Sequence, residues 1–266
     1  MLLRLNNITL CLACLGFFSC REDFPAFELV EQEPKIVIHF SLDNTSESFD
    51  IGSAFSDNQG WNLQLKTLKF YISDVDLISA NGRVQPLTDV ELVNFDDDQD
   101  GQINPFRQGY DYIIPKDNYS KFRFSLGLPS LVNQTDPTLL SKDNPLSTNS
   151  GMYWDWATMY VFIMLEAGID TNSDLIYDAN IAFHTGLDTL FRPENTYPIT
   201  FDLPAFAKDT IHVSIDWNEL FPTGGENEID LGEVPFFHAN VDNEALEMSR
   251  RFTENFIGSI TVKTND

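Results

Sequence analysis

The sequence contains four histidines, and imidazole is a common ligand of copper and zinc. His39 lies in an apolar, strand-like stretch, and His238 follows a Pro-Phe-Phe run. His184 comes just before Gly186, where the backbone can approach a site closely. His212 alternates onto the polar side of its stretch, which indicates a surface position. Spacing along the chain does not fix distances between strands, so His39, His184 and His238 could share a metal ion or each make ordinary hydrogen bonds.

A tryptophan-rich segment precedes the most apolar stretch of the chain. Met152, Trp154 and Trp156 stand two residues apart within it. Tryptophan ordinarily packs to bury area, which favours a packed entrance to a strand. The alternative is a metal or redox surround, because the Met152 thioether is a soft ligand and indole is oxidisable.

An acidic turn offers a second kind of metal site. Asp96, Asp98, Asp100 and Gly101 fit the D-x-D-x-D-G pattern, whose spaced carboxylates and turn glycine wrap Ca²⁺. The twelfth position of an EF-hand loop would be Arg107 in place of the bidentate Glu, so this is not an EF-hand. A looser calcium turn and a solvated acidic hairpin both remain open.

Composition and missing motifs exclude several classes of function. The chain has 16 Lys and Arg against 41 Asp and Glu, a net charge of −25, which argues against binding nucleic acid. Motifs of the forms GxSxG, GxxxxGK[ST], HExxH and GxGxxG are absent from the sequence. The common hydrolases, nucleotide-binding enzymes and zinc proteases are therefore disfavoured.

The amino-terminal residues indicate export. The apolar run Ile8–Phe18 is too short to span a membrane, so residues 1–19 are predicted to be a lipoprotein signal peptide. Cleavage before Cys20 would leave that residue as a lipid anchor and remove Cys11 and Cys14. The mature chain would then have no thiol for metal binding or catalysis.

The rest of the chain divides into a tether and one domain. Residues 20–34 are acidic and punctuated by proline, as in a spacer. Within this tether, Arg21–Asp23 resembles the acidic export tag of Bacteroidetes surface lipoproteins. We therefore expect an outer-membrane lipoprotein, facing the periplasm or the cell surface, with its domain at residues 35–266.

Period-2 alternation predicts a domain built mainly from strands. The expected strands are Lys35–Leu42, Trp61–Ser79, Val90–Phe95, Lys121–Leu126, Ala157–Glu166, Tyr197–Leu203, Thr210–Trp217 and Ile257–Val262. Apolar residues from Val241 to Phe256 follow one helical face, with Asp242 as N-cap and Gly258 beyond the end. The fold class is therefore all-β: a single antiparallel β-sandwich with one C-terminal helix and long loops.

These residues together resemble a known family. The matching features run in the order His39, Leu68–Val75, Phe124–Gly127, Gly151–Phe162, Phe183–Gly186, His238 and the helix through Phe256. This order is similar to that of the MbnP family, the copper-binding proteins named from methanobactin operons. The resemblance covers about Lys35 to Val262.

The resemblance implies a β-sandwich that binds copper outside the cytoplasm. It also implies a partner, a dihaem protein of the cytochrome c peroxidase type, which oxidises a tryptophan to kynurenine. On this chain it makes His39, His184 and His238 the expected copper ligands and Trp154 or Trp156 the expected modified residue, with Met152 lining the site.

The sequence as a whole predicts a lipid-anchored protein that captures, stores or delivers copper and has no turnover of its own. One alternative is a calcium-stabilised glycan-binding or adhesion module that uses the acidic turn. A second is a copper-dependent oxidase or a hydrolase that uses the same histidines with an open coordination position.

Overall fold

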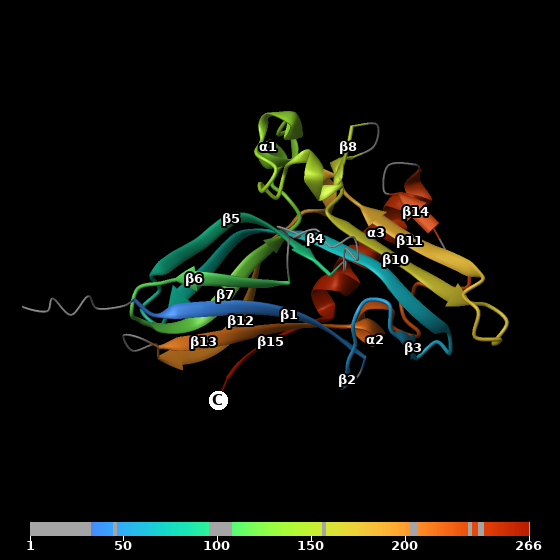
Figure 1. Cartoon of the computed structure of the whole chain (residues 1–266), viewed down its shortest axis with the longest axis horizontal. Helices are drawn as coiled ribbons and strands as arrows, with labels where there is room; N and C mark the ends of the chain where they lie inside the picture. Colours follow the sequence, from blue (N-terminus) through green and yellow to red (C-terminus); the bar gives the residue numbers. More distant parts are fainter. Residues whose placement is uncertain are drawn as a thin grey trace, which may run out of the picture. The chain divides into compact units, whose positions relative to one another are not determined.

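The computed structural model describes most of the chain from residue 33 onward (Figure 1). The described ranges are 33–44, 47–95, 108–155, 158–202, 207–233, 236–238 and 242–265. Several residues with predicted roles lie outside these ranges, and their roles stay predictions. They are the signal segment 1–19, Cys20, Asp96, Asp98, Asp100 and Trp156.

The smaller of the two main sheets, here called sheet A, contains five strands in the part of the chain that is described. Its order is β15-β13-β1-β2, and β6 also pairs with β1. The bounds are β1 (Lys35–Asn44), β2 (Glu47–Ser48), β6 (Gly109–Ile113), β13 (Lys208–Asp216) and β15 (Ile260–Thr264). Ile36, Ile38 and Phe40 of β1 are buried whereas Lys35 and His39 are exposed, because only one face of the sheet meets the core.

The larger sheet, sheet B, has eight strands among the described residues. Its order is β12-β7-β4-β10-β11-β14, and β3 and β5 also pair with β4. The bounds are β3 (Ala54–Ser56), β4 (Asn62–Ser79), β5 (Val84–Asn94), β7 (Asn118–Leu126), β10 (Ile163–Asp170), β11 (Ala179–Thr185), β12 (Arg192–Asp202) and β14 (Phe236–His238). The long strand β4 is the centre of the sheet, since four other strands pair with it.

The strands are mostly antiparallel, as the sequence predicted, with two departures. Among the described strands, β1 pairs with β13 in parallel and β11 pairs with β14 in parallel. A parallel pair cannot be closed by a tight turn, so it joins segments that are distant in the sequence. The predicted all-β sandwich is confirmed, and these two parallel pairs are exceptions to its antiparallel pairing; both carry histidines.

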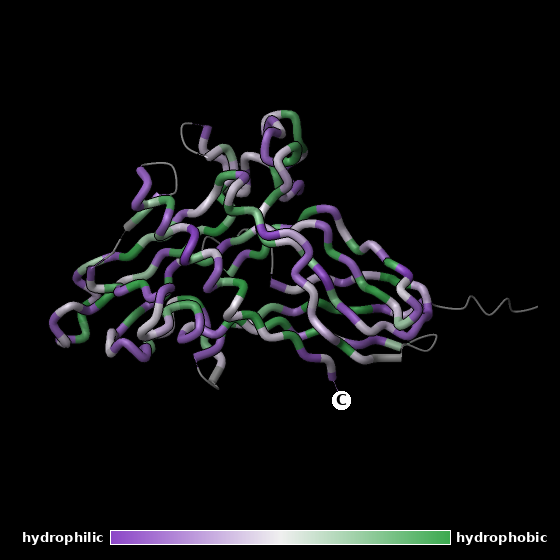
Figure 2. The backbone as a smooth tube through the Cα atoms, turned by 180° about the vertical axis from the view of Figure 1, so that it is seen from behind, coloured by the Kyte–Doolittle hydropathy of each residue, from purple (hydrophilic) through white to green (hydrophobic). Residues whose placement is uncertain are grey.

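The core lies between the two sheets. Phe40 of sheet A contacts Phe70 of sheet B with ring centroids 5.7 Å apart, and Phe256 of the C-terminal helix contacts Phe70 at 4.9 Å. Each fully buried Phe contributes about 1.5–3 kcal/mol of hydrophobic stabilisation. Hydrophobic and hydrophilic stretches alternate along the strands, which is the pattern that this packing requires (Figure 2).

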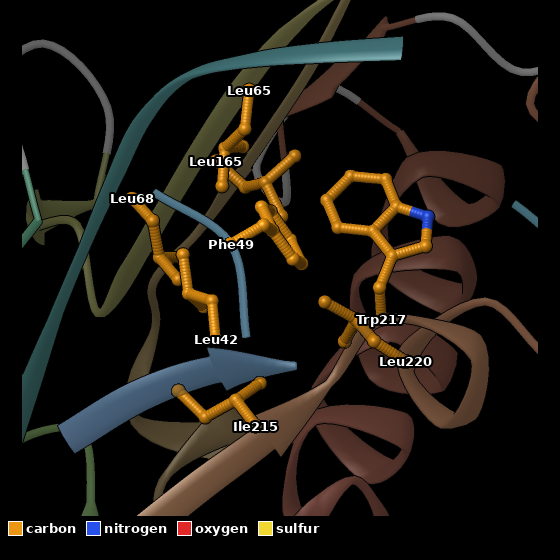
Figure 3. Close-up of a pocket in the computed structure, with 8 residues that line it drawn as sticks. All are labelled: Leu42, Phe49, Leu65, Leu68, Leu165, Ile215, Trp217 and Leu220. Carbon is orange, nitrogen blue, oxygen red and sulfur yellow. The ribbon is translucent and has the colours of Figure 1, made fainter. Parts of the chain in front are cut away.

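A narrow apolar gap remains at one end of the core, beside Trp217 (Figure 3). It is lined by Leu42, Phe49, Leu65, Leu68, Leu165, Ile215, Trp217 and Leu220 and has no room for a water molecule. A gap of this kind is a packing feature and offers no binding site.

An excursion between β7 and β10 covers part of the outer face of sheet B (Figure 1). Its elements are α1 (Ser130–Asn133), η1 (Pro137–Leu139), η2 (Thr148–Ser150), β8 (Tyr153–Trp154) and β9 (Met159–Tyr160). Met152, Tyr160 and Phe162 from this excursion form a second buried cluster with Tyr71 and Met164 of the sheet. Met152 is fully buried there, so the excursion buries the part of the sheet face around Tyr71 and Met164 that would otherwise be solvated.

The predicted helix is confirmed as α3 (Asn243–Gly258), and the Asp242 carboxylate accepts a hydrogen bond from the backbone N–H of Ala245. Gly258 is the last helical residue, and the strand that follows starts at Ile260. Two further short helices are α2 (Trp217–Leu220) and η3 (Asp188–Leu190). Trp217 was predicted to end a strand but begins α2, because Asp216 accepts from the N–H of Asn218 and caps a helical turn.

Candidate metal centre

Two distant histidines meet at the edge of sheet B. The parallel pairing of β11 with β14 sets His184 directly opposite His238. Nδ1 of His184 lies 2.9 Å from Nε2 of His238, and the ring centroids are 4.9 Å apart. Both side chains point away from the sandwich core, because the neighbouring Phe183 and Phe237 point into it. The outer face of sheet B thus presents two imidazole nitrogens to each other.

Glu166 on β10 fixes the orientation of His184. The Nε2–H of His184 donates to Oε1 of Glu166 at 3.0 Å. A carboxylate accepts, so His184 carries its proton on Nε2 and directs the Nδ1 lone pair at His238. The pairing of β10 with β4 shifts register between Glu166 and Ala167, and such bulges commonly re-aim a side chain beside a site.

Trp154 covers both imidazoles. Its indole meets His184 edge-on, with centroids 4.9 Å apart and planes at 89°, and lies 5.4 Å from the ring of His238. Trp154 belongs to β8, in the excursion that covers sheet B. The tryptophan-rich segment is therefore part of the site and also part of the packed layer over the sheet.

Burial sets the charge of the histidine pair. Desolvation lowers the pKa of His184, and the nearby His238 lowers it further, while Glu166 opposes the shift. Desolvation also lowers the pKa of His238. Both shifts favour neutral imidazole, which is the form that binds metal ions.

Gly186 brings the chain after His184 close to another backbone segment. A Cβ at this position would lie 2.6 Å from the carbonyl oxygen of Tyr160 and 2.6 Å from Oγ1 of Thr158. The sequence had suggested a close backbone approach here, and the geometry confirms it. Only glycine allows β11 to end against the excursion that carries Trp154.

His39 is not part of this site. It lies on β1 of sheet A, directly opposite His212 on β13, with ring centroids 6.0 Å apart. Within the part of the chain that the structure describes, no three His, Cys, Asp or Glu side chains gather to hold a metal ion. The expectation that His39, His184 and His238 converge is therefore wrong for His39, because the two sheets carry their histidines on different faces.

Sequence reasoning missed two neighbours of the pair, Glu166 and Met164. Met164 on β10 is the cross-strand partner of His184, and Glu166 lies two residues further along on the same face. Alternation along the predicted strand could have shown that these two side chains face the same way. It could not have shown that His184 lies beside them, since that depends on strand pairing.

The donor set fits a transition metal. Imidazole nitrogen suits copper and zinc, and copper is bound most strongly in the Irving–Williams order. Ligating histidines commonly donate their second N–H to a carboxylate, as His184 does to Glu166. The described residues supply two such nitrogens, so a copper ion there would need at least one further donor.

Comparison with known proteins gives two matches. A family model described as MbnP matches residues 33–249. A solved structure described as "MbnP from Methylosinus trichosporium" has a TM-score of 0.50 and 16% identity, covering 87% of this chain and 99% of that chain. At this identity the structural likeness shows the fold alone. The search of curated proteins returned no match.

None of the helices in the described part of the chain is long and apolar enough to cross a membrane.

Proposed function

The chain belongs to the MbnP family, and from this premise we propose that it binds copper through His184 and His238 and captures, stores or delivers the metal outside the cytoplasm. The single observation that carries the proposal is the contact between the two histidines. Their facing nitrogens are 2.9 Å apart, and Trp154 lies against both rings. The other ring nitrogen of His184, Nε2, donates to the carboxylate of Glu166. In the metal-free pair, Nε2–H of His238 donates to Nδ1 of His184. A metal cation would take the place of this proton, which moves to Nδ1 of His238, and both imidazoles would stay neutral.

Trp154 is the proposed source of a further donor. Oxidation of tryptophan to kynurenine adds oxygen, opens the pyrrole ring and releases one ring carbon as formate, which leaves an aromatic amine. This oxidation removes four electrons from the tryptophan, and they pass to oxygen or peroxide at a dihaem partner of the cytochrome c peroxidase type. Because Trp154 touches both imidazoles, an amine formed there would lie beside the two histidine nitrogens. Trp156 is the alternative position.

The test is competition for Cu⁺ between the purified protein and the chelator bicinchoninate. We expect one equivalent of copper to stay with the wild-type protein. His184→Ala/His238→Ala should bind it more than about 100-fold more weakly, because even outer-shell changes cost roughly 10- to 100-fold.

The matched control is His39→Ala/His212→Ala, which removes the same number of histidines from sheet A. This control should keep the tight copper. Circular dichroism establishes that each variant is folded, and His238→Gln serves as a second variant because His238 is only half-buried. Equal copper retention by the wild type and by a folded His184→Ala/His238→Ala variant would contradict the proposal.

Mass spectrometry of tryptic peptides tests the oxidation step. Protein produced together with its dihaem partner should carry the kynurenine mass at Trp154, and protein produced alone should carry unmodified tryptophan. A modification confined to Trp156 would reassign the donor. Unmodified tryptophan at both positions in the presence of an active partner would contradict this part of the proposal.

We also propose that the protein is held at the outer membrane by lipid on Cys20, facing the periplasm or the cell surface. Labelled fatty acid should be incorporated by the wild type and not by Cys20→Ser. Protease treatment of intact cells then separates the two faces, because only a surface-facing domain is digested. Equal labelling of wild type and Cys20→Ser would refute the anchor.

A further inference from the structure

All four histidines of the chain stand in cross-strand pairs, and the second pair lies on the outer face of sheet A. His39 on β1 and His212 on β13 are direct partners in the parallel register, and both are exposed. Their ring centroids are 6.0 Å apart, with planes at 67°. Each ligating nitrogen lies about 2.1 Å from a metal, so two imidazoles sharing an ion have centroids within roughly 6 Å.

The positions of His39 and His212 are set by strands that are anchored in the core. The residues on either side of the histidines, Ile38 and Phe40 on β1 and Ile211 and Val213 on β13, are buried in the core. The other neighbour of His39, across the antiparallel pair with β6, is Gly109. Glycine has no side chain there, so the ring of His39 is left open on that side.

An outer hydrogen-bond chain fixes the tautomer of His212. Nδ2 of Asn265 donates to Oδ1 of Asp209 at 3.2 Å, which fixes the orientation of the amide. Oδ1 of the Asn265 amide lies 3.1 Å from Nε2 of His212 and accepts a hydrogen bond from its Nε2–H. Neutral His212 therefore has its lone pair on Nδ1, the arrangement that prepares a histidine to bind a metal.

We propose that His39 and His212 form a second binding site, exposed to solvent, for a divalent transition-metal ion of the Cu²⁺ or Zn²⁺ type. Nδ1 of His212 and a ring nitrogen of His39 are the protein donors, and water completes the coordination. The net charge of −25 raises the local concentration of cations, whereas Lys263, opposite His212 on β15, opposes binding. The proposal goes beyond the proposed function and does not depend on His184 and His238, here called the buried pair.

The test is a Cu²⁺ titration followed by calorimetry and electron paramagnetic resonance. It uses the folded His184→Ala/His238→Ala variant, so that the signal comes from the exposed pair. One equivalent of Cu²⁺ with nitrogen hyperfine splitting is expected. Adding His39→Ala or His212→Ala should weaken binding by about 100-fold or more, the advantage that two linked donors have over one. Unchanged binding would overturn the proposal.

The same sheet face supplies a matched control. Ser41 and Ser214 are the next outward pair along β1 and β13, with hydroxyl oxygens 3.2 Å apart, so Ser41→Ala/Ser214→Ala should leave Cu²⁺ binding unchanged. Asn265→Ala removes the acceptor from His212 and should weaken binding by about tenfold. Equal loss of Cu²⁺ in the serine and histidine variants would show that binding is not specific to the pair.

The two copper sites can fail separately. Loss of tight Cu⁺ in His184→Ala/His238→Ala with no Cu²⁺ bound to the exposed pair would overturn this inference and leave the proposed function standing. Binding of Cu²⁺ at the exposed pair, together with no tight Cu⁺ in the wild type, would overturn the proposed function and leave this inference standing.

Discussion

His184 and His238 share the parallel strands β11 and β14, and His39 and His212 share the parallel strands β1 and β13. Each pair points outward from its sheet, and each is in direct register. His184 is only 6% exposed, whereas both histidines on sheet A are exposed. The same backbone arrangement therefore yields a covered site in one sheet and an open one in the other.

The cover over the buried pair comes from a single excursion of the chain. Residues between β7 and β10 lay Trp154 against both rings and pack Met152 and Tyr160 over the outer face of sheet B. Burial of His184 limits the access of water to its nitrogens, which strengthens their interaction with a cation and suits long retention of a metal. An exposed pair exchanges its metal with solvent readily.

The outer partners differ as well. His184 donates to the carboxylate of Glu166, whereas His212 donates to the amide oxygen of Asn265. A carboxylate acceptor makes the imidazole more basic and a stronger ligand than an amide acceptor does. The comparison thus predicts tight binding at the buried pair and weaker binding at the exposed pair.

The largest expected difference between the two pairs is in the loss of stability when the glycine beside each pair is substituted. Gly186→Ala inserts a Cβ 2.6 Å from a backbone oxygen, and such overpacking costs about 1–3 kcal/mol of unfolding free energy. Gly109→Ala is the matched change beside the exposed pair. Its Cβ meets nothing closer than 3.9 Å, so stability should change little. Denaturant unfolding of both variants measures the difference, and equal stability losses would contradict it.

An intermediate effect is expected from Glu166→Gln. Glutamine can still accept the hydrogen bond from Nε2–H of His184 but has no charge, so copper binding at the buried pair should weaken by about tenfold, or roughly 1.4 kcal/mol. Chelator competition measures this change. Asn265→Ala is the control, because it acts on the exposed pair and should leave the tight copper in place. Equal copper affinity in Glu166→Gln and the wild type would contradict the proposal that Glu166 strengthens His184 as a ligand.

The smallest effect concerns pH in the metal-free protein. Burial lowers the folded-state pKa of His184 and of His238, whereas the pKa of a histidine in the unfolded chain is about 6.5. Below that pH the unfolded chain binds more protons than the folded one, so the free energy of unfolding falls as pH falls. The loss of stability is measured by the melting temperatures of the wild type and of His184→Gln/His238→Gln, compared from about pH 7.5 down to about pH 5.

In that comparison the wild type should lose more stability on acidification than the double glutamine variant. His39→Gln/His212→Gln keeps both buried histidines and should therefore retain the wild-type loss. Parallel pH profiles for all three proteins would show that the buried pair makes no contribution.

Much of the secondary structure could be predicted from local patterns. Asp242 was expected to cap the C-terminal helix, and its carboxylate accepts from the N–H of Ala245. Asn81-Gly82, between β4 and β5, is a hairpin signal that can be seen in the sequence, and Gly82 has a positive φ of 87° in the structure. Caps, turns and alternation depend on residues within a few positions of one another, so the sequence displays them directly.

The candidate site was only partly predictable. Its residue types are visible in the chain, namely histidines with no competing thiol in the described residues and a tryptophan-rich segment. The grouping was wrong for His39, because nothing local distinguishes a histidine on one sheet from a histidine on the other. Glu166 was missed because its role depends on a diagonal contact across two strands.

By itself, the sequence determined which residues alternate inward and outward, where the helix begins, and which side chains were available for metal chemistry. Only the tertiary structure decided that His184 meets His238 and that His39 meets His212. Each meeting depends on a parallel pairing between segments far apart in the chain, and the free energy for it comes from the whole core rather than from the histidines.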